Sequence, residues 1–593
     1  MKYRLIAPIN SRYSAIEQVL TNRGIPHDKL YEYLNTTDEV ISSPLLLGEE
    51  NLKRAAGALI NAISQGVKIL VVVDSDCDGF TSAATLINYL YDQFPFLITN
   101  NRLSWFIHNG KQHGLSDCVD YILTGGYGLV ICPDASSNDY DEHSALAAAG
   151  IPVVVLDHHE AERISENAII VNNQLSDYPN KELSGVGVTW QFCRYLDSVL
   201  GTAAADKYID LVSLGNMADM MSLTSLETKH LILKGLNHVT NPFFKGMVEK
   251  NAFSIKGELT PMKVAFYVAP FINAIVRSGT QDEKELIFNS MLKFKAFDNI
   301  LSTKRGHKLG ELEQLVTQAL RVATNVKARQ TKAQDKGLEF LENMIEEQNL
   351  LDNKVLLFLL KPGQVDRNIA GLIANKFMAK YQRPCCILTE VREMDMNNNM
   401  DIEVSYQGSA RGCDKTGINN FKDICEMTKE IMYGEGHQGA FGLGIKEDNI
   451  PQFISKTNEI LKDTSDEPVY FVDYIYDGES VDPQNILDIA NMGNLWGKDM
   501  DEAMIAIKGL KVTENMVTLM SPDKSPTLKI QLPNRTSIIK FGSSQEEYEK
   551  FLAGGYVEVD IVGKCNKNEW MGNVSPQIFL EDYEIKSSCA YAF

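Results

Sequence analysis

The sequence contains no long apolar run, no secretory-signal pattern and no paired-cysteine motif. No stretch approaches the roughly 20 apolar residues needed to span a bilayer, and the first residues lack a basic flank followed by an apolar run. The ten cysteines are scattered without a CxxC spacing, and adjacent Cys385 and Cys386 are poorly placed for an ordinary disulfide with each other. We therefore expect a cytoplasmic protein with reduced thiols and no membrane partner.

Positive charge is also scarce, because 57 Lys and Arg residues stand against 78 Asp and Glu residues, a formal net charge of -21. This argues against a protein that coats nucleic acid non-specifically, since phosphate contacts come from Lys and Arg. An acidic enzyme can still bind DNA where metal ions and a local basic groove supply positive potential. The 593 residues, 44% of them hydrophobic, are enough for roughly three to five folded domains.

The pattern between residues 68 and 218 is typical of a mostly parallel sheet covered by helices. Short β-branched runs at 69–73, 103–107, 129–132 and 153–156 alternate with helix-length segments such as 82–91. Residues 240–345 then indicate a helical connection, in which Leu312, Leu315 and Leu320 could share one helix face.

A second α/β unit is predicted after this connection. It begins with the buried-strand pattern KVLLFLL and continues with a helix over 368–381 and the strand CCILTE, while 397–399 is expected to be a loop. From about residue 466 the sequence becomes strand-rich, with TLKIQLP, TSIIKFG and YVEVDIVG in succession, which favours a small barrel or sheet domain.

Three predicted strands of the first domain end in acidic or histidine-rich motifs. These are VVVDSDCDGF, LVICPDASSND and VVVLDHHE, which contain Asp74, Asp76, Asp78, Asp134 and Asp157. Ligands of open α/β sheets bind beyond the carboxyl ends of the strands, so these side chains should converge in space. Taken alone, the first motif could instead be a solvated acidic turn.

Histidines and a further carboxylate complete the candidate site. His158 and His159 supply imidazole, which together with carboxylates suits Mn²⁺ better than Mg²⁺ or Ca²⁺. Asp219 lies among apolar neighbours, where an unpaired carboxylate would be costly, although it could also cap a helix. Together these residues describe a site for two Mn²⁺ ions, with Mg²⁺ possible, in which a bridging water attacks phosphorus.

The motifs resemble those of the DHH phosphoesterase superfamily. DSDCDGFTSAA is similar to its first motif, PDASS to the second, the Asp157–His159 triplet to the third and LGNMADMMSL to the fourth. The resemblance implies that Asp76, Asp78, Asp134, His158 and Asp219 bind metal. Asp74 either joins these ligands or, like Asp157 and His159, supports the site. The implied catalytic set is Asp76, Asp78, Asp134, Asp157, His158, His159 and Asp219.

Within this superfamily the chain resembles the RecJ exonucleases along nearly its whole length. LSGVGVTWQF and IDLVSLGNMADMMSL, with RGIPHDKLYEYL and SPLLLG upstream, are similar to segments of that branch, and GSARG and GEGHQGAFG match glycine-rich motifs of the DHH-associated domain. The resemblance departs at Val276, where glycine is favoured, at Glu435, which interrupts a glycine run, and at His113, where tyrosine is usual. The implied substrate-binding residues are His159, Arg277, Arg329, Ser409, Arg411, Gly436 and His437.

The resemblance also implies a multidomain α/β architecture with a C-terminal oligonucleotide-binding (OB-like) barrel. Trp570, Phe541 and Tyr556 are candidate stacking residues there, although each could be a core residue instead. The predicted parts are an N-terminal segment packing on the catalytic domain (1–50), a DHH catalytic domain (51–238), a helical connector (239–345), a DHH-associated substrate-binding domain (346–463) and the OB-like domain (464–593).

The implied function is a metal-dependent 5′-to-3′ exonuclease that degrades single-stranded DNA to 5′ mononucleotides. One alternative is a DHH phosphodiesterase that cuts oligoribonucleotides or cyclic dinucleotides. A second alternative is a non-catalytic replication scaffold that binds DNA. The expected partner is single-stranded DNA, and a single-strand binding protein or a helicase is a further possible partner.

Overall fold

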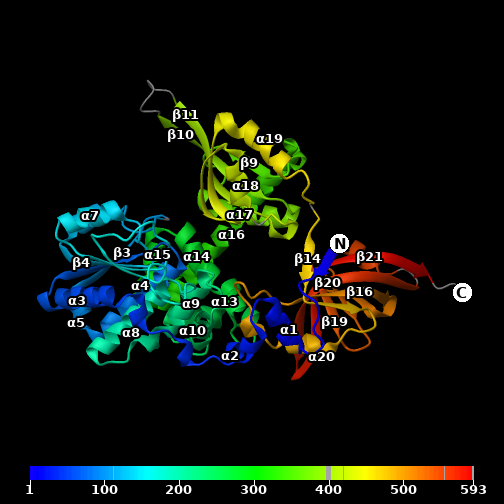
Figure 1. Ribbon diagram of the computed structural model, residues 1–593, viewed down its shortest axis with the longest axis horizontal. Helices are drawn as coiled ribbons and strands as arrows, with labels where there is room; N and C mark the ends of the chain where they lie inside the picture. The colour runs from blue at the N-terminus through cyan, green and yellow to red at the C-terminus, as the bar shows by residue number, and fades with distance from the viewer. Residues whose placement is uncertain (111, 395–401, 419, 466, 553–554, 591–593) are drawn as a thin grey trace. The chain divides into compact units, whose positions relative to one another are not determined.

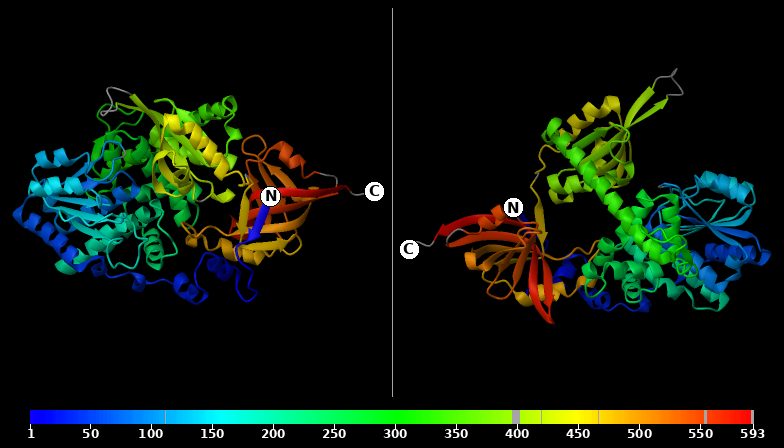
Figure 2. Two further views of the ribbon diagram at one scale, coloured as in Figure 1. Left: turned by 45° about the horizontal axis from the view of Figure 1, so that its top comes forward. Right: turned by 180° about the vertical axis from the view of Figure 1, so that it is seen from behind.

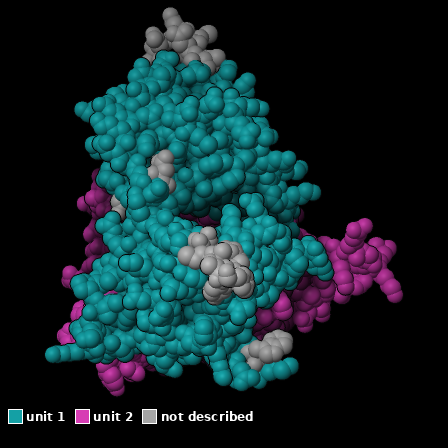
Figure 3. Space-filling view, turned by 90° about the vertical axis from the view of Figure 1, so that its right-hand side faces the viewer, with its two compact units in different colours: residues 1–18, 328–491, 503–593 teal, residues 19–327, 492–502 magenta. Residues whose placement is uncertain are grey.

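A computed structural model describes residues 1–110, 112–394, 402–418, 420–465, 467–552 and 555–590 (Figure 1). The chain divides into two compact units, which Figure 3 colours separately. Unit 1 contains residues 1–18, 328–491 and 503–593, and unit 2 contains residues 19–327 and 492–502. Among the described residues, no helix has both the length and the apolar composition needed to cross a membrane.

Unit 2 is built on a sheet of five parallel strands in the order β3-β2-β4-β5-β6. Its three central strands are buried along nearly their whole length, as expected for a sheet that is covered on both faces. The predicted parallel sheet is therefore confirmed, and β6 adds a fifth strand that the sequence analysis did not predict. The bounds are β2 (Lys68–Val73), β3 (Leu103–Ile107), β4 (Tyr127–Pro133), β5 (Val153–Asp157) and β6 (Ile169–Asn172).

Helices surround this sheet and continue beyond it as the predicted helical region. Those that precede or alternate with the strands are α2 (Leu30–Leu34), α3 (Glu49–Gln65), α4 (Cys77–Gln93), α5 (Phe96–Thr99), α6 (Val119–Gly125) and α7 (Tyr140–Ala148). Those that follow are α8 (Gly185–Leu200), α9 (Ile209–Ala218), α10 (Leu226–Leu236), α11 (Pro242–Lys250), α12 (Ala252–Ile255), α13 (Pro261–Tyr267), α14 (Ala269–Ser278) and α15 (Gln281–Met291).

The long helix α16 (Leu315–Glu347) closes this region and is drawn as one continuous helix in Figure 2. The prediction that Leu312 shares its apolar face is wrong. Leu312 belongs to the short strand β8 (Leu312–Gln314), where it pairs with Leu301 of β7 (Asn299–Leu301) and is 57% exposed. Strand pairing with a segment more than ten residues upstream replaces the first helical turn that the local pattern predicted.

The first sheet of unit 1 has the strand order β12-β13-β11-β10-β9, and only the pair β9–β10 is parallel. Alternate residues of β10 face opposite layers: Cys385 and Ile387 pack with α17, whereas Cys386 and Leu388 pack with α18 and α19. The predicted loop at 397–399 lies outside the described residues. The bounds are β9 (Leu356–Leu360), α17 (Arg367–Tyr381), β10 (Cys385–Met394), β11 (Ile402–Arg411), α18 (Phe421–Thr428), β12 (Ile431–His437), β13 (Ala440–Lys446) and α19 (Ile450–Ile460).

The C-terminal part of unit 1 contains a mixed sheet of seven strands in the order β15-β16-β20-β21-β19-β18-β17. Within the described residues its edge strands β15 and β17 do not pair with each other, so the barrel stays a prediction. The bounds are β15 (Tyr474–Asp477), α20 (Pro483–Ala490), β16 (Met504–Thr513), β17 (Val517–Met520), β18 (Thr527–Gln531), β19 (Ser537–Phe541), α21 (Gln545–Glu549), β20 (Gly555–Trp570) and β21 (Asn573–Ala590).

Two distant segments pair beside this sheet. Strand β1 (Lys2–Leu5) forms a parallel pair with β14 (Val469–Val472), and it precedes the helix α1 (Ala15–Asn22). Two segments more than 460 residues apart in the sequence are thus hydrogen-bonded neighbours in unit 1.

Candidate metal centre

The predicted ligands lie at one edge of the unit 2 sheet, where three neighbouring strands end. Asp74 follows β2, Asp134 follows β4 and Asp157 is the last residue of β5. Helix α4 begins beside Asp74, and α9 ends at Asp219. Because β2, β4 and β5 are parallel neighbours, their carboxyl ends bring these side chains together, as the sequence analysis expected.

Three groups of side chains at this edge have ligand atoms within 4.8 Å of one another. His158 belongs to two of these groups and Asp134 also belongs to two, so the groups share members. Such sharing is the arrangement expected for two neighbouring cations held by common ligands. The groups are Asp134 with Asp157, His158 and His159; Asp78 with His158 and Asp219; and Asp74 with Asp76 and Asp134.

Backbone geometry fixes two of the carboxylates. Asp134 adopts a left-handed conformation with φ of 68°, an uncommon conformation for a residue with a side chain and one that clusters at functional sites. Asp78 accepts hydrogen bonds from the backbone N–H groups of Gly185 (2.7 Å) and Val186 (3.2 Å) at the start of α8, and from the Ser184 hydroxyl. No pattern in the sequence indicates that α8 anchors Asp78.

Glycine is required where α4 approaches β2. A Cβ at Gly79 would lie 2.6 Å from the carbonyl oxygen of Asp74, closer than any real Cβ contact. Gly79 N–H also donates to the Asp76 side chain at 2.8 Å, so Asp76 caps α4. No pattern in the sequence indicates this cap.

A second layer of hydrogen bonds orients the histidines. Asp157 accepts from the backbone N–H groups of His158 (2.7 Å) and Ser137 (3.1 Å), and it lies 2.7 Å from Nδ1 of His159. Burial alone raises the pKa of Asp157, but the hydrogen bond with His159 and the charges of both histidines hold it well below its usual range. Burial lowers the pKa of His159, and the bond to Asp157 outweighs this and raises it to about 9.

The other carboxylates repel one another. Burial and the charge of Asp76 raise the pKa of Asp78 to about 7, and burial and the charge of Asp78 raise that of Asp219 to about 8. Burial and the neighbouring carboxylates raise the pKa of Asp134 well above its usual range. Burial and His159 lower the pKa of His158 to about 4, so its imidazole is neutral and offers a lone pair.

These features fit a divalent cation. Oδ1 of Asp134 is buried without a hydrogen-bond donor and lies 3.3 Å from Nε2 of His158, which in turn is 3.4 Å from Oδ2 of Asp219. Carboxylate oxygens with a neutral imidazole are the donor set that suits Mn²⁺. The protein's own groups do not neutralise the repulsion among the buried carboxylates. A bound cation would offset that repulsion.

Two further side chains of unit 2 lie beside this centre. Nδ1 of His113 is 2.6 Å from Oδ2 of Asp74, so the residue at this departure from the family pattern contacts the metal centre. Sequence reasoning missed this contact, although it had singled out His113. Arg277, at the end of α14, is partly buried; burial lowers its pKa, and the negative charge of Asp76 opposes that shift. Arg277 is therefore within electrostatic reach of Asp76.

The predicted substrate-binding residues of unit 1 gather on its first sheet. Arg411 and His437 both pair with Ala440, so their side chains share one face of the sheet, roughly 10 Å apart across two strand spacings. Ser409 and Glu435 both pair with Gly442 on the same face, and Gly436 has a left-handed φ of 123°. Arg329 lies on an exposed face of α16.

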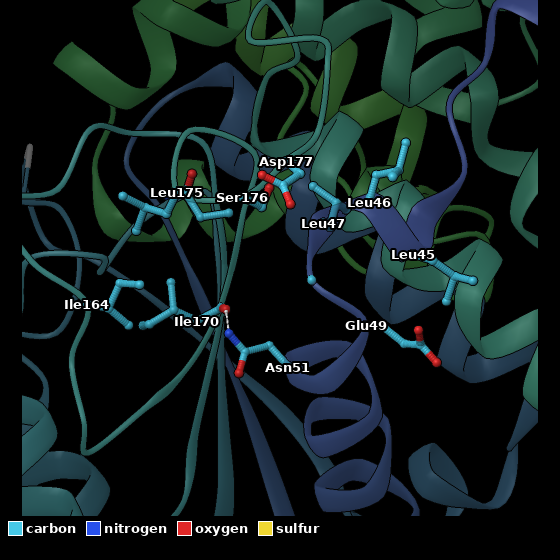
Figure 4. A pocket seen from close by; sticks show the side chains of 12 residues that line it. Leu45, Leu46, Leu47, Glu49, Asn51, Ile164, Ile170, Leu175, Ser176 and Asp177 are labelled. Carbon is cyan, nitrogen blue, oxygen red and sulfur yellow. Dashed lines mark hydrogen bonds between the residues drawn. The ribbon is translucent and has the colours of Figure 1, made fainter.

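A separate pocket of about 310 Å³ lies in unit 2 near the start of α3 (Figure 4). Leu45, Leu46 and Ile164 contribute apolar side chains, and Asn51 donates a hydrogen bond to the carbonyl of Ile170 at 2.9 Å. None of the described residues that line it belongs to the metal centre. The pocket is therefore distinct from the candidate site.

The comparison with known proteins agrees with this geometry. The profile of the DHH family, N-terminal domain, matches residues 68–216, which include the three strand ends. YorK of the SPbeta prophage of Bacillus subtilis (strain 168), assigned by name to the single-strand DNA-specific exonucleases, is 33% identical over 588 residues, covering 99% of this chain and 98% of YorK. The chain belongs to the DHH family.

Other DHH proteins are related over most of this chain. The single-stranded-DNA-specific exonuclease RecJ of Bacillus subtilis (strain 168) is 25% identical over 564 residues, covering 93% of this chain and 65% of that RecJ. The crystal structure of RecJ in complex with Mn²⁺ from Thermus thermophilus superposes with a TM-score of 0.70 at 18% identity, covering 99% of this chain and 80% of that one. This DHH chain therefore shares a RecJ-like multidomain fold.

Proposed function

We propose that the protein is a metal-dependent exonuclease that degrades single-stranded DNA from the 5′ end and releases 5′ mononucleotides. The observation that carries the proposal is the sharing of His158 and Asp134 among three ligand groups at one sheet edge. Two divalent cations bound there, Mn²⁺ or Mg²⁺, would supply the Lewis acidity that activates water and neutralises charge on a phosphodiester. The relatives named as single-strand DNA-specific exonucleases support the substrate class.

The proposed ligands are Asp74, Asp76, Asp78, Asp134, His158 and Asp219, and the chain's other residues hold them in place. Asp157 fixes the orientation of His159, whose side chain is 56% exposed and can donate to a phosphate oxygen. Arg277, in the last turn of α14, is within electrostatic reach of Asp76 and can bind a backbone phosphate. The short Asp157–His159 distance and the exposure of His159 support the roles proposed for these two residues.

The glycine-rich face of unit 1 is proposed to bind the terminal phosphate. Arg411, His437 and Ser409 share that face, and the small residues Ala440 and Gly442 lie between their strands. A phosphate can approach a backbone closely where no side chain projects, and a guanidinium can bind it with two hydrogen bonds. Arg329 and the C-terminal sheet, as an OB-like domain, are proposed to contact the strand further along.

The test is an end-labelled nuclease assay on the full-length protein with Mn²⁺. Single-stranded DNA labelled separately at each end is compared with duplex DNA, single-stranded RNA and a dinucleotide, with and without a single-strand binding protein. Immediate release of mononucleotides from the 5′ label, with progressive shortening of the 3′-labelled strand, is expected.

A matched pair of variants assigns any activity to the metal centre. Asp134→Asn should be inactive, whereas Glu166→Gln, an exposed acid of the same unit, should cleave normally. If only RNA or the dinucleotide is cleaved, the proposed DNA substrate is wrong and the protein is a DHH phosphodiesterase with a different substrate. A folded, metal-loaded protein that cuts nothing would favour the non-catalytic scaffold.

A further inference from the structure

Three aromatic side chains are exposed on two consecutive helices of unit 2. Phe253 of α12 is 84% exposed, Phe266 of α13 is 65% exposed and Tyr267 of α13 is 37% exposed. We refer to these three residues as the aromatic patch. Helices α12 and α13 are neighbours along the chain and in space, and α13 leads directly into α14 (Figure 1).

The segment of sequence that carries the patch is basic although the protein is acidic. Residues 241–281 contain five Lys or Arg residues and two Glu residues, a formal charge of +3 in a chain whose net charge is -21. The ammonium group of Lys256 lies 4.7 Å from the centre of the Phe253 ring. Lys263 donates to the carbonyl oxygens of Lys256 (2.8 Å) and Glu258 (2.7 Å), which holds the turn of Phe253 against α13.

Helix α14, which follows the patch, packs on α4 and α9, and these two helices begin and end at ligands of the candidate metal centre. Only Val268 separates α13 from α14, and Arg277 follows Phe266 by 11 residues. Val268, with φ of -127° and ψ of -62°, interrupts the helix, so Phe266 and Arg277 lie on two adjoining helices, and the 11 residues between them limit their separation to at most about 40 Å. Arg277 is within electrostatic reach of Asp76. A strand held at Arg277 would therefore have its following nucleotides within reach of Phe266.

We propose that the aromatic patch is a base-stacking platform for single-stranded DNA that enters the metal centre. This rests on the proposed function and extends it by naming where the bases bind. Aromatic side chains between lysines suit single-stranded DNA, because every base has a flat face to stack and every nucleotide carries a negative phosphate. The excess of positive charge in this segment favours nucleic acid over an apolar protein partner.

The test measures binding without catalysis. Fluorescence anisotropy with EDTA present gives the affinity of the full-length protein for 5′-phosphorylated oligo(dT) of 3 and of 12 nucleotides. Phe266→Ala should weaken binding of the 12-mer by about 5-fold or more, the loss expected for one stacked base. In Phe266→Ala, the ratio of the affinity for the 12-mer to the affinity for the trimer should fall as well. Phe266→Tyr should restore the affinity for the 12-mer and this ratio.

Two further variants separate stacking from charge and from surface effects. Lys256→Gln should lower the slope of log affinity against log salt, whereas Phe266→Ala should leave that slope unchanged. Tyr31→Ala removes an aromatic side chain of unit 2 that is 82% exposed outside the patch, and it should bind as the wild type does. Unchanged affinity of folded Phe266→Ala protein for the 12-mer would overturn the proposal. The same result is expected if the aromatic patch binds a protein instead of DNA.

The outcome is independent of the nuclease assay. Loss of 12-mer affinity in Phe266→Ala, combined with no Mn²⁺-dependent cleavage by the wild type, would uphold the platform and reject the exonuclease. Cleavage by the wild type with unchanged affinity and length preference in Phe266→Ala would reject the platform and leave the exonuclease standing. Equal melting temperatures of the two proteins show that both are folded in these assays.

Discussion

At the scale of single residues, the side chains of the candidate metal centre destabilise the fold when no metal is bound. Asp78, Asp134 and Asp219 are crowded together, and burial with mutual repulsion raises the pKa of each. Asp134 also holds a left-handed backbone conformation that costs free energy in a residue other than glycine. A fold keeps such features when they serve a site.

Replacing Asp134 by Asn should therefore abolish activity without lowering the stability of the metal-free protein. The neutral amide removes one repelling charge, so the metal-free variant should melt at a temperature equal to or above that of the wild type. Turnover on single-stranded DNA with Mn²⁺ should fall by about 1000-fold or more, because a shared ligand is lost. Calorimetry in EDTA and the end-labelled assay measure the two effects. A lower melting temperature would contradict the repulsion argument.

Lys229 provides a test of pH dependence away from the metal centre. Its ammonium group is buried, donates to the carbonyl of Tyr33 and lies 4.2 Å from the centre of that residue's ring. Burial lowers its pKa from 10.5 to about 8. The folded state thus binds fewer protons than the unfolded state between these values, so this group's contribution to the free energy of unfolding rises with pH across that window.

The comparison of wild type with Lys229→Met isolates that contribution. The difference in their free energies of unfolding, wild type minus variant, should increase from pH 7.5 to pH 10 in urea titrations at constant ionic strength. The variant lacks the titrating group, so groups common to both proteins cancel. A difference that does not change with pH would show that Lys229 has an ordinary pKa.

At the scale of elements, the close contact between α4 and β2 sets the position of the metal centre. A methyl group at Gly79 would lie 2.6 Å from the backbone of Asp74, so Gly79→Ala should destabilise unit 2 by about 1–3 kcal/mol. Nuclease activity should fall as well, because Asp74 and the Asp76 cap must move. Urea unfolding and single-turnover cleavage measure both effects.

Gly57→Ala is the matched control for this substitution. Gly57 lies inside α3 with nothing within 4 Å of an added Cβ, so alanine there should stabilise by up to about 1 kcal/mol and leave activity unchanged. Equal destabilisation by the two substitutions would show that the α4–β2 contact has no special role.

The sequence predicted the metal centre better than its supporting contacts. Residues after buried parallel strands must meet at one sheet edge, which is why Asp74, Asp134 and Asp157 were found from strand patterns alone. The bond of His113 to Asp74 depends on how the loop after β3 folds back, and no periodicity encodes that. Leu312 was misplaced in a helix because pairing with Leu301 overrides a local preference.

At the scale of the whole molecule, two compact units should unfold as separate transitions, because each unit has its own internal packing. The candidate metal ligands all belong to unit 2. Saturating Mn²⁺ should therefore raise the melting temperature of only one of the two calorimetric transitions. At a free Mn²⁺ concentration 100-fold above the dissociation constant, the added free energy of unfolding should be about 2.7 kcal/mol. EDTA should reverse the shift, and Asp134→Asn should weaken it. Equal shifts in both transitions would contradict the assignment.

The five-part domain division stays a prediction at this scale. It follows continuous stretches of sequence, whereas unit 1 draws on residues 1–18, 328–491 and 503–593. No pattern in the first residues indicates that their partner strand lies more than 460 residues later. Pairing between segments so far apart depends on the complete fold, and it cannot be predicted from local secondary-structure propensity.

The pairing of β1 with β14 has a consequence for how the protein is made. Residues 2–5 leave the ribosome before residues 469–472, with which they pair and which are synthesised on the order of tens of seconds later. Unit 2 can complete its parallel sheet during that interval, while the first strand waits without a partner. Nascent chains arrested before residue 469 should therefore expose that strand to chaperones and proteases, and a bulky tag fused in front of it should delay maturation of unit 1 alone.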